Sequence, residues 1–306
     1  MKKTPYTVIF STCNRKDMLA HALDAVMEKW EPDEVIVADD ASSDGTGELL
    51  REAYPGVRHI CPEKNIGPAA IRNLGIQAAR NDIVIGLDDD TIVQSDETVL
   101  SVFDSLKNES IGALALPFAN VLQSPEVHCM APDDKENWVT FSFVAAAYAL
   151  RRSCFEKYGP FRTIIRFMNE EDDLTLRFLD NGIFTGMVKT DIVQHMQSAA
   201  RNTRFADIFG RRNDILFHAY NAPGHQVLLN LLGTMYKGLV FGARNGRLLR
   251  TLHGYYLGFS SLAGTLKNER KPVSNCSYKL YNRLKRHGPM PLSEAQDVLK
   301  AENKCL

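Results

Sequence analysis

The chain has 306 residues, 44% of them hydrophobic, and a formal net charge of −1. This length and composition can bury a large core, as one sizeable α/β domain or a domain with an appendage. The six cysteines are scattered without a Cys-x-x-Cys pair, which argues against a disulfide framework or a zinc site. The amino end lacks the apolar run of a signal peptide, so we expect no secretory leader.

The charge is divided unevenly along the chain. Residues 1–200 hold 19 Lys and Arg against 31 Asp and Glu, a balance of −12, whereas residues 201–288 hold 15 against 3, a balance of +12. The basic side chains alternate with Leu, Phe, Tyr and Gly at helical spacing, which favours an anionic membrane surface over nucleic acid. Ordinary solvated helix faces are the alternative. We therefore expect a cytoplasmic protein, peripheral at the inner face of a membrane, with no nucleic-acid partner.

The first 117 residues alternate strand and helix patterns. Apolar, β-branched runs predict strands at 6–11, 34–39, 57–61, 83–87 and 111–117. Amphipathic spacing predicts helices at 17–29, 45–53, 68–79 and 95–106. This alternation is typical of an α/β fold with a Rossmann-like, mostly parallel sheet flanked by helices. Ligands of such sheets bind beyond the carboxyl ends of the strands.

The later part of the chain is more mixed and mainly helical. We expect helices at residues 172–180, throughout residues 201–265, and at residues 293–302. The most apolar segment, residues 226–242, contains an asparagine and a lysine and falls short of the roughly 20 apolar residues that cross a membrane. Residues 264–291 are basic, and we expect a loop there.

Three consecutive carboxylates, Asp88, Asp89 and Asp90, end the predicted strand at 83–87. Adjacent like charges repel, and unpaired buried charge is costly. A hard cation such as Mg²⁺ or Mn²⁺ would offset both effects, because it prefers oxygen ligands and is often shared with a phosphate. An exposed acidic turn is the alternative.

Four polar clusters follow successive predicted strands, and they occupy residues 11–15, 39–46, 65–73 and 88–90. Taken singly, each is compatible with turn or capping chemistry. A doubly wound sheet would gather all four along one edge. Together they offer carboxylates for a base or ribose, a cation for phosphate and a metal site, which predicts a pocket for a nucleotide diphosphate.

The ordered series of motifs resembles the family-2 glycosyltransferases, which have the GT-A fold. The resemblance covers roughly residues 5–200 and rests on VIFSTCNR at 8–15, VADDASSDGT at 37–46, NIGPAAIRN at 65–73, LDDD at 87–90, AAAYALRR at 145–152, YGPF at 158–161, EEDDLTLR at 170–177 and His195. It implies a GT-A domain over 1–200, with a nucleotide-sugar half at about 1–117 and an acceptor half at about 118–200. A basic, mainly helical region would follow over 201–306.

The resemblance also implies roles for the matching residues. Asp88 would lie near the ribose, while Asp90 would ligate Mn²⁺ or Mg²⁺ and His195 would complete the metal or diphosphate site. A structural role is the alternative for His195. The other residues expected to bind the nucleotide sugar are Thr12, Asn14, Arg15, Asp39 or Asp40, Asn65, Arg72 and Asp89.

The acidic segment at 170–173 opens a predicted helix. Acidic residues there favour the helix dipole by about 0.3–1 kcal/mol each, which gives a purely structural alternative. Sugar transfer also needs a carboxylate to accept the proton of the acceptor hydroxyl. The family register indicates Glu171 as this base, or Asp172 if the register slides by one. Arg162 stands where the family has an acid, which favours a phosphorylated acceptor.

We therefore predict a metal-dependent, inverting glycosyltransferase that moves a sugar from a nucleotide-diphosphate sugar to a surface glycan or lipid-linked acceptor. The segment Asp88 to Thr91 also fits a haloacid-dehalogenase-like phosphatase, with Asp88 as nucleophile and Asp90 as acid. In those enzymes the motif normally follows the first strand, whereas several βα units precede it here. A sugar-nucleotide-binding module without catalysis is the third alternative.

Overall fold

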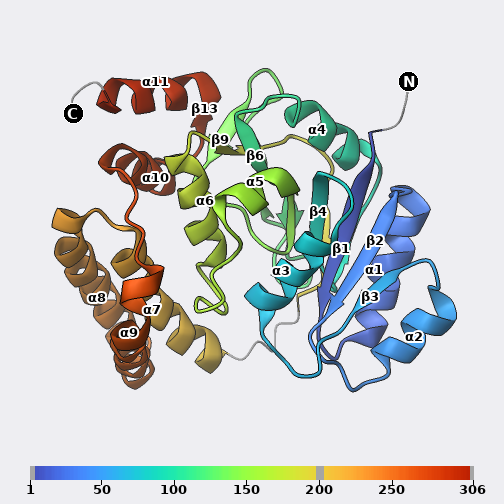
Figure 1. The fold of residues 1–306 in the computed structure, drawn as a ribbon, viewed down its shortest axis with the longest axis horizontal. Helices are drawn as coiled ribbons and strands as arrows, with labels where there is room; N and C mark the ends of the chain where they lie inside the picture. The colour runs from blue at the N-terminus through green and yellow to red at the C-terminus, as the bar shows by residue number, and fades with distance from the viewer. Residues whose placement is uncertain (1–3, 198–202, 304–306) are drawn as a thin grey trace.

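A central sheet with helices on both faces occupies most of the computed structural model, which describes residues 4–197 and 203–303 (Figure 1). Helices from the end of the chain gather beside it, at the left in Figure 1. The α/β class with a helical C-terminal region is confirmed. Residues 201 and 202, at the start of the predicted helical region, lie outside the described residues.

The central sheet has nine strands in the order β13-β9-β11-β6-β10-β4-β1-β2-β3. Neighbours among β1 to β4 run parallel, as predicted, whereas β10 runs antiparallel between β4 and β6, and β9 is antiparallel to β11 and β13. The sheet is therefore mixed. Its strands are β1 (Tyr6–Thr12), β2 (Glu34–Asp39), β3 (Arg58–Ile60), β4 (Ile83–Asp88), β6 (Ile111–Ala115), β9 (Trp138–Thr140), β10 (Ala147–Arg151), β11 (Phe184–Met187) and β13 (Met290–Pro291).

The central strands are buried on both faces because their side chains alternate between two cores. Val8 and Phe10 of β1 pack in one core with the apolar stripe of α1, and Ile9 packs in the other with α3. Burial of each such side chain contributes about 1.5–3 kcal/mol. The helices of this part are α1 (Lys16–Lys29), α2 (Thr46–Ala53), α3 (Pro68–Ala78), α4 (Glu97–Ser105), α5 (Arg152–Tyr158) and α6 (Glu170–Asp180).

A second, four-stranded sheet brings distant segments to the end of β4. Its order is β5-β12-β7-β8, from β5 (Thr91–Ile92), β12 (Val193–His195), β7 (Phe118–Ala119) and β8 (Val127–His128). The register pairs His195 with Thr91, and the backbone N–H of Met196 donates to the carbonyl of Asp90 at 2.7 Å. This pairing fixes His195 beside the acidic run.

The C-terminal helices are α7 (Thr203–Asn221), the 3₁₀ turn η1 (Gly224–Gln226), α8 (Val227–Arg244), α9 (Leu248–Glu269), α10 (Asn275–His287) and α11 (Leu292–Asn303). The predicted loop at 264–291 is wrong, because α9 continues to Glu269 and α10 follows. Ser274 caps α10 by accepting a hydrogen bond from the backbone N–H of Ser277 at 3.2 Å. Tyr278, Tyr281 and Leu284 bury one face of α10.

Glycines allow α7, α8 and α9 to pack closely. A Cβ atom at Gly254 of α9 would lie 2.5 Å from the carbonyl oxygen of Ile208, and one at Gly238 of α8 would lie 1.9 Å from the Tyr255 hydroxyl. Across residues 4–197 and 203–303, no helix combines the length and apolarity that a bilayer-spanning segment needs.

Candidate active site

The predicted polar clusters converge at the carboxyl ends of β1, β2 and β4. A strand-end cavity of about 190 Å³ opens there, and Thr12, Arg15, Asp40 and Asp89 help to line it. A larger His195 cavity of about 490 Å³ adjoins it, and the two share Arg72 and Asp88 in their walls. Residues that follow several different strands therefore lie around two adjoining cavities, as a single site at the strand ends requires.

Separate partners hold Asp88 and Asp89. Asp88 Oδ1 accepts hydrogen bonds from Arg72 at 2.9 Å and from the Ser11 hydroxyl at 3.1 Å. Asp89 accepts from the Thr12 hydroxyl at 2.7 Å and from Arg15 at 3.0 Å. Burial raises the pKa of Asp89 to about 7, although Arg15 and Thr12 oppose the shift.

Asp90 lies between a cation and an imidazole. Its Oδ2 accepts from Arg15 at 2.7 Å, and its Oδ1 is 3.1 Å from His195 Nε2. Burial raises the pKa of Asp90, but His195 and Arg15 outweigh burial and the net pKa is lowered. His195 Nδ1 lies 2.7 Å from Oδ1 of Asn120, which orients the ring.

The same residues fit a divalent cation. Asp88, Asp90 and His195 each offer one ligand atom, and these three atoms lie within 4.8 Å of one another. Asp90 Oδ1 is buried and, despite the nearby imidazole, accepts no hydrogen bond of good geometry from the described part of the chain. A carboxylate–imidazole set of this kind suits Mn²⁺ or Mg²⁺. A second group, Asp39 with His59 and Cys61, has the required spacing, but two of its members are exposed.

Arg72 links the acidic run to α6. Its guanidinium is buried and donates to Glu170 Oε1 at 3.2 Å as well as to Asp88. Burial lowers the pKa of Arg72, but the two carboxylates outweigh it and the net pKa is raised. Burial and then the charge of Glu171 raise the pKa of Glu170 well above its usual range.

The two candidate bases line different cavities. Glu171 lines the His195 cavity, and its Oε1 accepts from the backbone N–H of Ala145 at 3.1 Å. Burial raises the pKa of Glu171. Asp172 instead lines a separate cavity beside the C-terminal helices, where it accepts from the Tyr281 hydroxyl at 2.6 Å and from Lys285 at 2.7 Å.

The acids after β2 are engaged by the backbone. Both carboxylate oxygens of Asp40 accept backbone N–H groups, from Ile66 at 2.6 Å and from Gly67 at 2.9 Å. Asp39 accepts from the backbone N–H of Ser42 at 2.9 Å and lies 3.1 Å from His59 Nε2. These contacts shape the loops around the strand-end cavity.

Asn14 and Asn65, the two asparagines expected to bind the nucleotide sugar, form hydrogen bonds within the same loops. Asn14 accepts the backbone N–H of Ser43 through its side chain at 2.7 Å, which ties the loop after β1 to the loop after β2. Asn65 donates to the Asp40 carbonyl at 3.2 Å. Neither side chain lines the two cavities described above.

Arg162, expected near the acceptor, lies elsewhere. It pairs with the buried Asp173, donates to Asn221 at 2.9 Å and lies 3.4 Å from Glu269. It therefore joins α6 to the C-terminal helices and lines neither cavity. Because the arginine has acidic partners of its own, it gives no reason to expect a phosphorylated acceptor.

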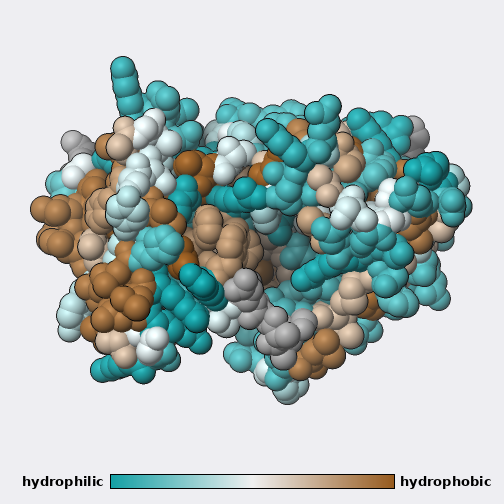
Figure 2. Space-filling view, turned by 90° about the horizontal axis from the view of Figure 1, so that it is seen from below, coloured by the Kyte–Doolittle hydropathy of each residue, from teal (hydrophilic) through white to brown (hydrophobic). Residues whose placement is uncertain are grey.

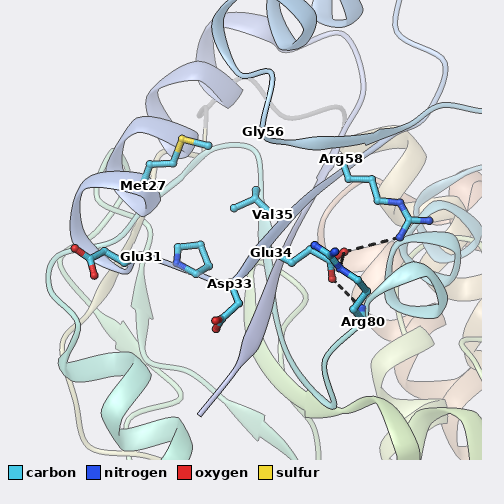
Figure 3. A pocket seen from close by; sticks show the side chains of 9 residues that line it. Met27, Glu31, Asp33, Glu34, Val35, Gly56, Arg58 and Arg80 are labelled. Carbon is cyan, nitrogen blue, oxygen red and sulfur yellow. Dashed lines mark hydrogen bonds and ion pairs between the residues drawn. The ribbon is translucent and has the colours of Figure 1, made fainter. Parts of the chain in front are cut away.

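A further cavity of about 560 Å³ lies at the opposite, amino end of β2 (Figure 3). Glu34, Arg58 and Arg80 are among the residues that line it, and Arg80 donates a hydrogen bond to Glu34 at 3.0 Å. The residues in its walls come from none of the four predicted clusters. Size alone therefore does not identify the site.

Comparison with known proteins places the motifs in one family. The model of glycosyl transferase family 2 matches residues 7–171. The succinoglycan biosynthesis protein ExoO of Rhizobium meliloti is 36% identical over 92 residues, which are 29% of this chain and 26% of ExoO. A poly-beta-1,6-N-acetyl-D-glucosamine synthase of Staphylococcus aureus is 32% identical over 111 residues, 35% of this chain and 27% of the synthase. The matches thus span about a quarter of these relatives.

Solved structures share the fold over nearly the whole chain. The mannosyltransferase PcManGT of Pyrobaculum calidifontis, solved with GDP-Man and Mn²⁺, is 19% identical with a TM-score of 0.57, covering 98% of this chain and 86% of PcManGT. Residues 1–349 of S. aureus TarS, solved with UDP-GlcNAc, are 15% identical with a TM-score of 0.59, covering 98% and 92%.

Proposed function

The chain belongs to glycosyl transferase family 2 and is a glycosyltransferase, and we propose that it transfers a sugar from a nucleotide-diphosphate sugar in a metal-dependent, inverting reaction. The acceptor we propose is a hydroxyl of a surface glycan or of a lipid-linked glycan. One observation carries the proposal: Asp88, His195, Arg72 and Glu171 line two adjoining cavities at the carboxyl ends of the strands, and Asp90 lies beside Asp88 and His195.

The strand-end cavity is the proposed nucleotide site. Thr12 and Arg15 hold Asp89, and Arg15 also reaches Asp90, so this corner carries both the donors and the acceptors that a nucleotide needs. The nucleotide sugars bound by PcManGT and TarS support this choice of donor class. Asn14, Asn65, Asp39 and Asp40 would support the nucleotide mainly by shaping the loops. The base and the sugar are left open.

Asp90 and His195 would hold Mn²⁺ or Mg²⁺, with Asp88 beside them. When bound, the cation would neutralise the charge that develops on the departing nucleotide diphosphate. Arg72 contributes a fixed positive charge at the wall shared by the two cavities. Its pairing with Asp88 and Glu170 keeps the guanidinium in place without reorganisation during the reaction.

Glu171 is the proposed general base. The N–H of Ala145 orients its carboxylate in the His195 cavity, and the raised pKa brings the group nearer to the range in which a base works best. The acceptor hydroxyl would lose its proton to Glu171 as its oxygen attacks the anomeric carbon and the bond to the diphosphate breaks. A single carboxylate and one displacement correspond to inversion at that carbon.

We further propose that residues 1–117 bind the donor, residues 118–200 the acceptor, and that the region from 201 to 306 lies against an anionic membrane surface. The +12 balance of residues 201–288 supports the last point. The names of ExoO and the poly-N-acetylglucosamine synthase support a role in polysaccharide biosynthesis.

Thermal stability with UDP, GDP, CDP and dTDP, each with and without Mn²⁺, tests the donor site. A ligand that binds only the folded state raises the unfolding temperature. We expect one nucleotide to give a shift that depends on the metal. The absence of a shift with all four nucleotides would contradict the proposed site. Donor binding without transfer to any glycan acceptor would support the module without catalysis.

A further inference from the structure

Apolar side chains gather on the outside of the C-terminal helices, at the left of Figure 2. On α8, Leu228, Leu229, Leu232 and Tyr236 are all more than half exposed. Leu249, Leu252, Tyr256 and Phe259 form a second exposed stripe along α9. Exposed apolar stripes at helical spacing on two neighbouring helices are the mark of an interaction surface.

A polar cavity of about 420 Å³ lies next to the stripe of α8. It is formed between the start of α6 and the helices α7, α8 and α10, and the exposed Leu229 is part of its wall. Four cationic and two acidic side chains line it, a balance of +2: Arg211, Lys237, Lys285 and Arg286 against Asp172 and Asp214. The cavity therefore favours an anionic ligand.

Two of the four cations are already neutralised within the protein. Lys285 donates to Asp172 at 2.7 Å, and Arg211 donates to Asp214 at 2.8 Å. Among the salt bridges of the described residues, the cations of this cavity contribute Arg211–Asp214 and Lys285–Asp172, and none involves Lys237 or Arg286. Both charges are thus left for a ligand, one on α8 and the other on α10.

The remaining wall supplies neutral hydrogen-bonding groups. His218 lies 2.7 Å from the Tyr278 hydroxyl and 2.9 Å from the Thr234 hydroxyl, while Asn230 and Asn282 also face the cavity. Burial lowers the pKa of His218 to about 4, so its ring is neutral at pH 7. Both ring nitrogens of His218 are thus engaged within the protein, and a phosphate group matches the amides of Asn230 and Asn282 and the two cations without a salt bridge, because it accepts several hydrogen bonds and carries the charge that the cavity favours.

We propose that this cavity binds the phosphate-bearing headgroup of a membrane lipid, whose hydrocarbon chains lie along Leu229 and Leu232 of α8. The positive balance of the cavity is complementary to the phosphate charge. The exposed leucines at the rim offer a surface to hydrocarbon chains, which a free anion lacks, so we favour a lipid over a free anion. This inference rests on the proposed membrane association and not on the chemistry of sugar transfer. Because Asp172 and Glu171 line separate cavities, the lipid would bring the membrane surface close to the base without entering the His195 cavity.

Vesicle flotation of the full-length protein tests the proposal. We expect binding to vesicles of phosphatidylcholine with one fifth phosphatidylglycerol, and none to phosphatidylcholine alone. The double variant Lys237→Ala, Arg286→Ala should bind roughly thirtyfold more weakly, since each cation at an anionic lipid surface contributes roughly a factor of five. The matched control, Lys267→Ala with Lys271→Ala, removes the same charge from exposed positions and should change binding less than threefold.

The apolar part has its own pair of variants. Leu229→Ser with Leu232→Ser should weaken vesicle binding at least tenfold, whereas Leu100→Ser, at a similarly exposed leucine of α4, should leave it unchanged. Equal losses in the two charge variants would overturn the proposal in favour of diffuse attraction. Stabilisation by inorganic phosphate without vesicle binding would overturn it in favour of a soluble anion.

A nucleotide-binding control tests the proposed lipid site and the proposed glycosyltransferase function separately. All these variants should keep the metal-dependent thermal shift with the nucleotide, because none of the altered residues lines the strand-end cavity. Failure of vesicle binding with an intact nucleotide shift would contradict the lipid site alone. Loss of the nucleotide response in the unaltered protein would contradict the proposed function alone.

Discussion

Replacing Glu171 by Gln removes a proton acceptor and almost nothing else. The glutamine carbonyl can still accept the N–H of Ala145, which Glu171 accepts at 3.1 Å. Burial disfavours the charged form and outweighs the opposing charge of Arg72, so the pKa of Glu171 is raised. The neutral amide should therefore leave the unfolding temperature unchanged or raise it.

The expected loss of activity is large. A positioned general base contributes roughly 10²- to 10⁴-fold, which corresponds to about 3–5 kcal/mol of barrier height. The assay is release of the nucleotide diphosphate with the donor that gives the thermal shift and an acceptor that supports turnover. We expect kcat to fall by this factor while donor binding is unchanged, since Glu171 does not line the strand-end cavity.

Asp172→Asn is the matched control. Asp172 faces Tyr281 and Lys285, so its amide variant should keep kcat within a few-fold and lose at most about 1 kcal/mol of stability, because Lys285 is half exposed. A fully active Glu171→Gln protein together with an inactive Asp172→Asn protein would refute the assignment of the base.

Three further predictions concern the metal, the acidic network and pH. Asp90→Ala should abolish the metal-dependent part of donor binding in calorimetric titrations, and unchanged binding would contradict the metal assignment. Arg72→Met leaves Asp88 and Glu170 without their buried partner and should lower the free energy of unfolding by about 3–5 kcal/mol in denaturant titrations; a loss below about 1 kcal/mol would show that neither acid depends on it. The stabilising contribution of His218 should fall as pH drops from 6.5 toward about 4, because unfolded chains protonate His218 in this window and the folded protein does not, whereas Asp89 with its raised pKa contributes a slope of the opposite sign. The difference in free energy of unfolding between the unaltered protein and His218→Gln should therefore shrink as pH falls, and a difference that does not change with pH would contradict the assignment to His218.

Much of the nucleotide half could be predicted because its elements are local. The runs that end in Thr12, Asp39 and Asp88 form strands whose carboxyl ends meet, as the βα alternation indicates. The family match confirms the resemblance to family-2 glycosyltransferases and argues against the alternative of a haloacid-dehalogenase-like phosphatase. The antiparallel β10 was not predicted, since periodicity fixes a strand but not its neighbours or its direction.

Contacts between distant segments account for most of what was missed. Asn120 orients His195, yet it lies in a stretch without a motif, and only the pairing of β7 with β12 brings the two together. From the sequence we expect a loop in place of α10 because basic residues are interspersed among its apolar ones. Its buried tyrosines and the Ser274 cap were the signal that could have revealed it.

Helix geometry allows Glu171 and Asp172 to face different cavities but does not require it. Neighbouring residues on an α-helix point about 100° apart, yet Glu170 and Glu171 both line the His195 cavity. What the sequence could not supply is which face of α6 meets the site, because the packing of α10 against α6 decides it.

An experimental structure with Mn²⁺ and the nucleotide diphosphate that stabilises the protein tests the proposed metal and nucleotide sites together. We predict anomalous density for one Mn²⁺ within about 2–2.5 Å of Asp90 and His195 ligand atoms, with the nucleotide in the strand-end cavity. Mn²⁺ at Asp39, His59 and Cys61 instead, or a nucleotide bound away from the ends of β1 and β4, would contradict the proposed active site.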